Sequence, residues 1–67
     1  MRKFAERLKE LRTENELSTL ELSKQVHIGV ASISRWENGK SDIKGEQLIT
    51  LSQFFKVSTD YLLGIEE

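Results

Sequence analysis

The feature that most constrains this sequence is a pair of helix starts only 11 residues apart. Ser18 and Glu21 have the spacing of a capping box, in which each side chain bonds the free backbone N–H of the other residue. A helix is therefore predicted to start at Thr19. A second start follows at Val30, because apolar residues flank Gly29 at the same spacing at which they flank the first cap. Two short helices must meet there through a tight turn and cross steeply.

The rest of the chain also has a helical apolar period and no strand pattern, so the predicted fold class is all-α with five helices. Proline is absent, and the four glycines fall where the apolar pattern breaks. The predicted helices cover about residues 2–14, 19–25, 30–37, a stretch that contains Leu48, Leu51, Phe54 and Phe55, and residues 59–63, with Ser58 as a cap and Gly64 as the end. The predicted core comprises Leu8, Leu11, Leu22, Val26, Ile33, Leu48, Leu51, Phe55 and Leu62, with Trp36 at its edge.

Length and composition bound the class of protein. A chain of 67 residues has enough apolar surface for one core, so a single domain over residues 1–67 is expected. With 37% hydrophobic residues the chain is not of the disordered class, and no apolar run is long enough to span a bilayer. It has no cysteine and opens with Met-Arg-Lys rather than a secretory signal, so a cytoplasmic location is expected.

The inventory of reactive side chains argues against catalysis. His27 is the only histidine, cysteine is absent and there are only two aspartates, so neither a nucleophile with its base nor a metal site is expected. No cofactor or small-molecule ligand is evident either. A binding protein is the better interpretation. Residues 1–45 carry nine Lys or Arg against seven acids, whereas residues 46–67 carry one lysine against four acids, so a polyanion should meet the first two-thirds.

The predicted helix over residues 30–37 has one apolar and one slender side. At the α-helical period, Ile33 and Trp36 mark its buried side. The opposite side carries small or uncharged residues and one long donor, namely Val30, Ala31, Ser34, Arg35 and Asn38. Short residues with one long donor suit a helix that enters the major groove, about 12 Å wide, but these residue types could also occur there by chance.

The stretch LSTLELSKQVHIGVASISRWENGK, residues 17–40, resembles the helix-turn-helix DNA-binding domain of the phage repressor and Cro type, also called the xenobiotic response element family. The resemblance extends through KELR at residues 9–12 and VSTDYLLG at residues 57–64. It implies a compact five-helix, lambda-repressor-like domain with the motif at about residues 18–38. It also implies a transcription regulator that binds double-stranded DNA as a homodimer.

The resemblance further implies which residues touch DNA. Base contacts are expected from Val30, Ala31, Ser34 and Arg35. Arg35 is the strongest candidate, because a guanidinium can donate two hydrogen bonds to guanine O6 and N7. Val30 and Ala31 have no donors and could contact only thymine methyl groups or permit close approach, in contrast to family members that carry glutamine or arginine there.

Phosphate contacts are expected from both sides of the same surface, namely from Ser18, Thr19, Ser32, Asn38, Lys40 and Lys44. The family also pairs an arginine of the first helix with the glutamate of the WENG-like segment beneath the recognition helix, which here are Arg12 and Glu37. This ion pair is expected to be structural. Two positions depart from the family pattern: His27 stands where glycine usually adopts a left-handed conformation, and Gly29 replaces the commoner Ser or Thr cap.

The predicted function is therefore sequence-specific binding of double-stranded DNA, with repression of transcription, by insertion of residues 30–37 in the major groove. Candidate homodimer contacts are Ile49, Tyr61, Leu63 and Ile65, and half-sites should lie about 10 bp apart. The alternative is a module of the same shape that binds a partner protein, such as an antagonist of a related regulator. The net charge of −1 and the apolar start of the recognition helix keep this alternative open. An enzyme and a membrane partner are not expected.

Overall fold

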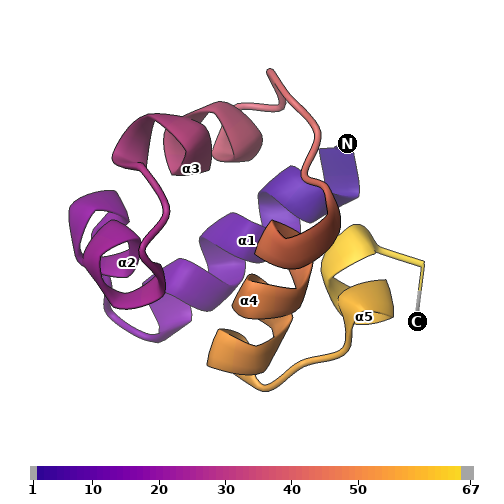
Figure 1. Cartoon of the computed structure of the whole chain (residues 1–67). Coiled ribbons are helices and arrows are strands. Elements are labelled where there is room, and N and C mark those ends of the chain that lie inside the picture. The colour runs from indigo at the N-terminus through magenta and orange to yellow at the C-terminus, as the bar shows by residue number, and fades with distance from the viewer. Residues whose placement is uncertain (1, 66–67) are drawn as a thin grey trace.

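Five helices make up the computed structural model, which describes residues 2–65 (Figure 1). The helices are α1 (Arg2–Glu14), α2 (Thr19–Val26), α3 (Val30–Glu37), α4 (Gly45–Phe55) and α5 (Thr59–Leu63). The predicted all-α fold class is confirmed, and α2 ends one residue later than the sequence suggested. Residue 1 and residues 66–67, the ends of the predicted domain, lie outside the described part.

Caps explain where α2 begins and where α5 begins and ends. Ser18 Oγ accepts from the backbone N–H of Glu21, and the Glu21 carboxylate accepts from the backbone N–H of Ser18, so both halves of the capping box are present. Ser58 caps α5 by accepting from the N–H of Tyr61. At the end of α5, Gly64 has φ +76°, and a Cβ there would lie 2.4 Å from the Cβ of Lys3. Only glycine lets the end of α5 approach α1 so closely.

The helices share one core. Helix α1 packs against α3 and α5, α2 packs against α3 and α4, and α4 packs against α5. In Figure 1, α2 and α3 occupy one side of the molecule and α5 the other. Every helix contributes at least one side chain with no exposed surface, and these are Phe4, Leu8, Leu22, Ile33, Leu51 and Leu62. Full burial of such a side chain contributes about 1.5 to 3 kcal/mol to the free energy of unfolding. Packing in one core therefore stabilises all five helices.

The predicted core needs three corrections. Leu48 and Phe55 are only partly buried, at the rim of the core. Trp36, expected at the edge, is 4% exposed and belongs to the core, as does Ile43, which is 6% exposed although it lies between α3 and α4. The loop between α3 and α4 is therefore anchored by its own apolar side chain. Among residues 2–65, no helix is both long enough and apolar enough to cross a membrane.

Candidate nucleic-acid interface

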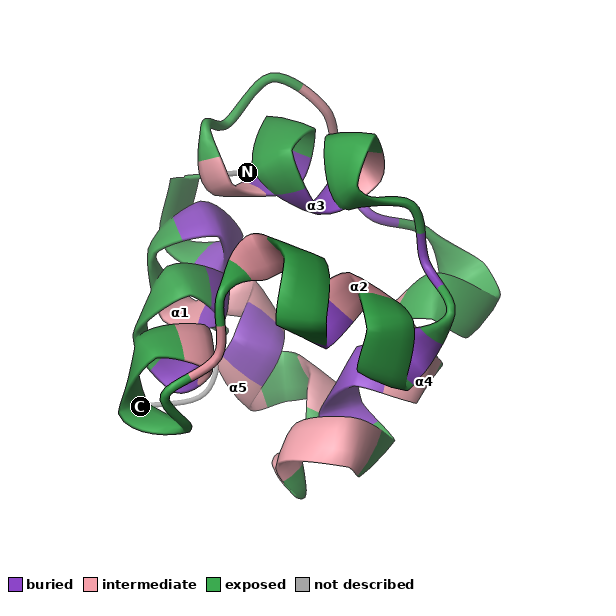
Figure 2. Cartoon of the chain, turned by 90° about the vertical axis from the view of Figure 1, so that its left-hand side faces the viewer, coloured by how far each residue is buried: buried purple, intermediate pink, exposed green. Residues whose placement is uncertain are grey.

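Helix α3 has one side buried in the core and one side open to solvent (Figure 2). The buried side carries Ile33 and Trp36, with exposed fractions of 0% and 4%. The open side carries the four residues expected to contact bases, Val30, Ala31, Ser34 and Arg35, all of them exposed. We call these four residues the outer face of α3. The structure brings them together on one uncovered helix surface, as a helix that enters a groove requires.

An aromatic contact seats the second half of α3 on α1. The rings of Phe4 and Trp36 meet edge to face, with centroids 6.1 Å apart and an interplanar angle of 65°. Such pairs contribute about 0.5 to 1.5 kcal/mol beyond the area that they bury. Trp36 therefore acts as an anchor beneath the outer face rather than as a platform on which a base could stack.

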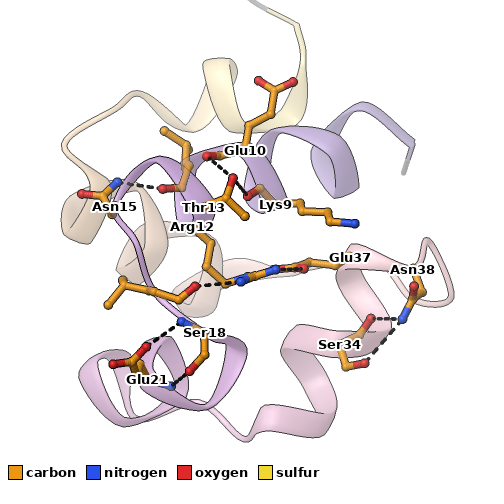
Figure 3. Close-up of polar contacts among 12 residues, drawn as sticks. Lys9, Glu10, Arg12, Thr13, Asn15, Ser18, Glu21, Ser34, Glu37 and Asn38 are labelled. Atoms are coloured by element: carbon orange, nitrogen blue, oxygen red, sulfur yellow. Dashed lines mark hydrogen bonds and ion pairs between the residues drawn. The ribbon is translucent and has the colours of Figure 1, made fainter.

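The ion pair expected between Arg12 and Glu37 is present, and it is bidentate (Figure 3). Arg12 Nε donates to Glu37 Oε2 at 2.7 Å, and Nη2 donates to Oε1 at 3.0 Å. The side chains are only 12% and 8% exposed. The hydrogen bond to Glu37 raises the pKa of Arg12 above its ordinary value, the carboxylate charge adds to the rise, and desolvation opposes it. The glutamate of α3 is thus held by a cation rather than presented to a polyanion.

Arg12 also holds the entry to α2, a role that the sequence did not suggest. Its Nη1 donates to the backbone carbonyl of Leu17 at 2.7 Å. One guanidinium thus bonds the residue before the α2 cap and the last residue of α3. Because α2 and α3 are the two helices of the motif, Arg12 fixes both of them relative to α1.

The turn between α2 and α3 is closed by residues on either side of it. His27 adopts the left-handed conformation expected of it, with φ 58° and ψ 38°. Ser23 Oγ donates to the carbonyl of Ile28 at 2.5 Å, and the Ile28 N–H donates to the carbonyl of Ser23 at 3.3 Å. This reciprocal pair ties α2 to the residue before the α3 cap. The sequence reasoning missed Ser23, the fifth of the eight residues of α2, and the available signal was its hydroxyl in the second half of a short helix.

The residues expected to contact phosphates differ in their exposure. Lys40 and Lys44 are exposed, whereas Thr19 and Ser32 are partly buried. Ser18 is exposed, but its backbone N–H is already donated to Glu21 at 2.8 Å. The Ser18 backbone N–H is therefore engaged within the capping box rather than left for a phosphate.

Helix α3 ends at Asn38 and Gly39. Asn38, with φ −94° and ψ 5°, is right-handed, and Gly39, at φ 70°, makes the left-handed turn. The Asn38 side chain folds back on α3, where its Nδ2 donates to the carbonyl of Ser34 at 2.8 Å (Figure 3). Asn38 is exposed, but its amide nitrogen already has an acceptor within the chain.

Comparisons with known proteins place this geometry in a family. A model of the helix-turn-helix family matches residues 8–62. The HTH-type transcriptional activator BcrR of Enterococcus faecalis is 41% identical over 64 residues, which are 96% of this chain and 31% of BcrR. The HTH-type transcriptional regulator ImmR of Bacillus subtilis is 37% identical over 64 residues, 96% of this chain and 50% of ImmR. Repressor protein C2 of Salmonella phage P22 is 34% identical over 60 residues, 90% of this chain and 28% of that protein.

Solved structures give the same result. The crystal structure of the P22 c2 repressor in complex with a synthetic operator superposes with a TM-score of 0.88 at 30% identity, covering 98% of this chain and 100% of that chain. The solution structure of the P22 c2 repressor DNA-binding domain gives 0.81 at 33% identity, with coverages of 90% and 79%. This chain spans between about a quarter and a half of the length of the relatives that match it. It belongs to the helix-turn-helix family of DNA-binding transcriptional regulators.

Proposed function

We propose that this chain binds double-stranded DNA sequence-specifically, inserts α3 in the major groove and represses transcription. The observation that carries the proposal is the outer face of α3, whose four residues are all exposed while the opposite side of the helix is buried. The operator-bound P22 repressor, which has the same fold, supports it. This function would place the protein with the DNA, in the cytoplasm.

Base contacts come from the outer face in this proposal. Arg35 donates to the edge of a guanine, a bidentate contact that contributes about 1 to 3 kcal/mol of discrimination. Val30, 41% exposed, and Ala31 pack against thymine methyl groups, since neither side chain has a donor or acceptor. Ser34 lies one turn after Val30 and offers the remaining polar group.

Phosphate contacts flank the groove. Ser18 and Thr19 would meet one strand from the start of α2, and Lys40 and Lys44 would meet the other from the loop after α3. Ser32, partly buried beside the outer face, would add a hydroxyl. Asn38 was grouped with these residues from the sequence, but its amide nitrogen is engaged by Ser34, so its role is considered separately below.

The proposed form on DNA is a two-fold homodimer. The candidate contacts are Ile49 and Ile65, which are 50% and 69% exposed, and the partly buried Tyr61 and Leu63. Exposed isoleucines of this kind are the apolar surface that a second copy could cover. Repression needs nothing further than occupancy of promoter DNA. The C2 protein of phage P22 is a repressor, whereas BcrR is an activator.

The direct test is titration of duplex DNA at two salt concentrations. Phosphate contacts predict that affinity falls steeply with salt, by roughly 10³-fold between 50 and 200 mM if a dimer neutralises about six phosphates. A DNA library that yields an enriched sequence would support specific binding. Absence of binding above background at low salt would contradict the proposal and favour the module that binds a partner protein.

A further inference from the structure

Two exposed polar residues of α3 are linked to each other before any DNA arrives. Asn38 Nδ2 donates to the backbone carbonyl of Ser34 at 2.8 Å and to Ser34 Oγ at 3.4 Å (Figure 3). Asn38 follows Ser34 by one turn, so both side chains project from the same side of the helix. Both acceptors belong to Ser34, and the carbonyl oxygen is the nearer of the two.

The hydrogen bond from Asn38 determines whether the Ser34 hydroxyl is left as a donor or as an acceptor. A hydroxyl has one proton and two lone pairs, so an oxygen that accepts from Asn38 keeps its proton for another partner. Some hydroxyls elsewhere in the helices use that proton internally: Thr13 and Thr50 donate to carbonyls four residues earlier, at 2.9 Å in both cases, and Ser52 donates to the Ile49 carbonyl. Within residues 2–65 no such acceptor is recorded for Ser34, so its proton is available to the groove.

We propose that Asn38 acts on sequence reading through Ser34, by fixing the Ser34 hydroxyl as a hydrogen-bond donor toward the major groove. This proposal rests on the proposed DNA-binding function. A hydroxyl held as a donor can bond acceptor atoms such as purine N7, guanine O6 and thymine O4, but it cannot bond the amino group of cytosine, which is itself a donor. Asn38 is therefore a positioning residue for one base-pair preference, and not a phosphate contact.

In the alternative role, the Asn38 amide donates to a phosphate. A phosphate oxygen accepts hydrogen bonds, so it could bind only the Nδ2 hydrogens and not Oδ1. A swing of the amide away from Ser34 would forfeit the 2.8 Å bond to the Ser34 carbonyl, which also accepts from the Asn38 backbone N–H at 3.0 Å. Donation of the second Nδ2 hydrogen alone would leave that bond in place. Both roles predict weaker binding when Asn38 is lost, but they differ in which sequences are affected.

The test measures base preference on a randomised duplex library for the wild-type chain and for Ser34→Ala, Asn38→Ala and the double variant. We expect each single variant to lose about threefold to tenfold discrimination at the same one position per half-site, the range of a single hydrogen bond. The double variant should lose no more than either single variant, because both remove one contact. Lys40→Ala is the matched control: it should weaken all sequences alike and keep the preference.

A second variant guards against a trivial loss of structure. In Asn38→Asp the carboxylate can only accept, so the Ser34 proton turns back toward residue 38 and the hydroxyl presents lone pairs to the groove. The added charge should weaken binding to every sequence, while the preference at the affected position should shift toward bases that present amino donors, cytosine and adenine. Thermal unfolding of each variant establishes that it is folded at the assay temperature.

The outcomes distinguish failure of the positioning role of Asn38 from failure of the proposed DNA binding. If Asn38→Ala weakened all sequences equally with the preference intact, or if its effect added to that of Ser34→Ala, the positioning role would be overturned. An unchanged preference in Asn38→Asp would overturn it as well. If the wild-type chain bound no duplex at all, the proposed function itself would fail, whatever the variants did.

Discussion

Arg35 is the only cationic residue of α3, and it lies on the outer face. Its five N–H donors have a fixed planar arrangement that matches the two acceptors of a guanine edge, whereas the ammonium of lysine is a single point charge. The contribution of Arg35 to binding is therefore expected to be geometric as well as electrostatic. The two contributions can be separated by substitution.

Arg35→Ala should lower the preference between the selected operator and its variants at one base pair by about tenfold, with the fold retained because the side chain is exposed. Arg35→Lys keeps the charge and serves as the matched variant: it should retain most of the affinity for random duplex while losing the same preference. Competition binding with single-substitution operators measures both quantities. Unchanged discrimination in Arg35→Ala would remove the residue from the base-reading set.

At the scale of the element, the start of α2 depends on a carboxylate at the end of its first turn. The backbone N–H of Ser18 and then its hydroxyl lower the pKa of Glu21 below its ordinary value, with Lys24 adding to the effect. A carboxylate with a lowered folded pKa stabilises the native state above its unfolded pKa. That contribution is lost as the pH falls through the folded pKa.

Glu21→Gln should therefore flatten the pH dependence of the free energy of unfolding below about pH 4.3, the ordinary pKa of glutamate. The amide oxygen of glutamine can still accept from the Ser18 N–H, so stability near neutral pH should change little. Glu21→Ala, which removes both the charge and the acceptor, should be less stable at every pH. Urea unfolding monitored through Trp36 across pH 3 to 7 measures the profiles, and an unaltered acid slope in Glu21→Gln would contradict the argument.

The Arg12–Glu37 pair offers a second test at this scale. Arg12→Ala leaves the nearly buried Glu37 carboxylate and the Leu17 carbonyl without their cation, which should cost on the order of 3 kcal/mol. For a domain of this size that is a large share of the whole free energy of unfolding. Replacing both partners, as in Arg12→Met with Glu37→Leu, should recover part of the loss because no charge is then stranded. Urea titration measures the difference, and strictly additive effects would exclude coupling between the two side chains.

At the scale of the element, the sequence predicted the helix ends and the outer face of α3, but not several contacts of the loops and helix ends. The helix ends were predictable because their causes are local: Ser18 with Glu21, Ser58 and Gly64 act within a few residues of themselves. The outer face of α3 followed from helical period alone. Burial of Ile43 depends on where other elements pack, so no local pattern indicated it. The bond from Ser23 to the Ile28 carbonyl depends on how the chain turns after α2. The position of the Asn38 amide is likewise a property of the folded helix end.

For the whole molecule, charge is distributed unevenly along the sequence. Residues 1–45, which include α1 to α3, carry a net charge of +2, and residues 46–67 carry −3. The positive excess comes from residues 1–14, whereas residues 15–45, which include α2 and α3, carry four cations and four acids. Helix α1 packs against α5, so net charge alone does not turn α3 toward a polyanion. The proposed DNA contacts therefore depend on individual donors around α3 rather than on the net charge.

A homodimer on DNA predicts a fixed distance between half-sites. Selected operators should contain two inverted half-sites about 10 bp apart, centre to centre. Insertion of about five base pairs between them turns one half-site by about half a helical turn, so both should no longer be bound by one dimer. Affinity should fall to that of an isolated half-site, which a single half-site duplex measures directly. Insensitivity to the insertion would show that one copy suffices.

The attachments of α3 have a consequence for how this scaffold could change its target. Ile33, Trp36 and Glu37 fasten the helix from beneath, and none of them belongs to the outer face. Residues 30, 31, 34 and 35 can therefore be exchanged without disturbing those attachments. A small library varied at these four positions should yield stable proteins with new operator choices, which makes this domain a starting point for retargeting by design.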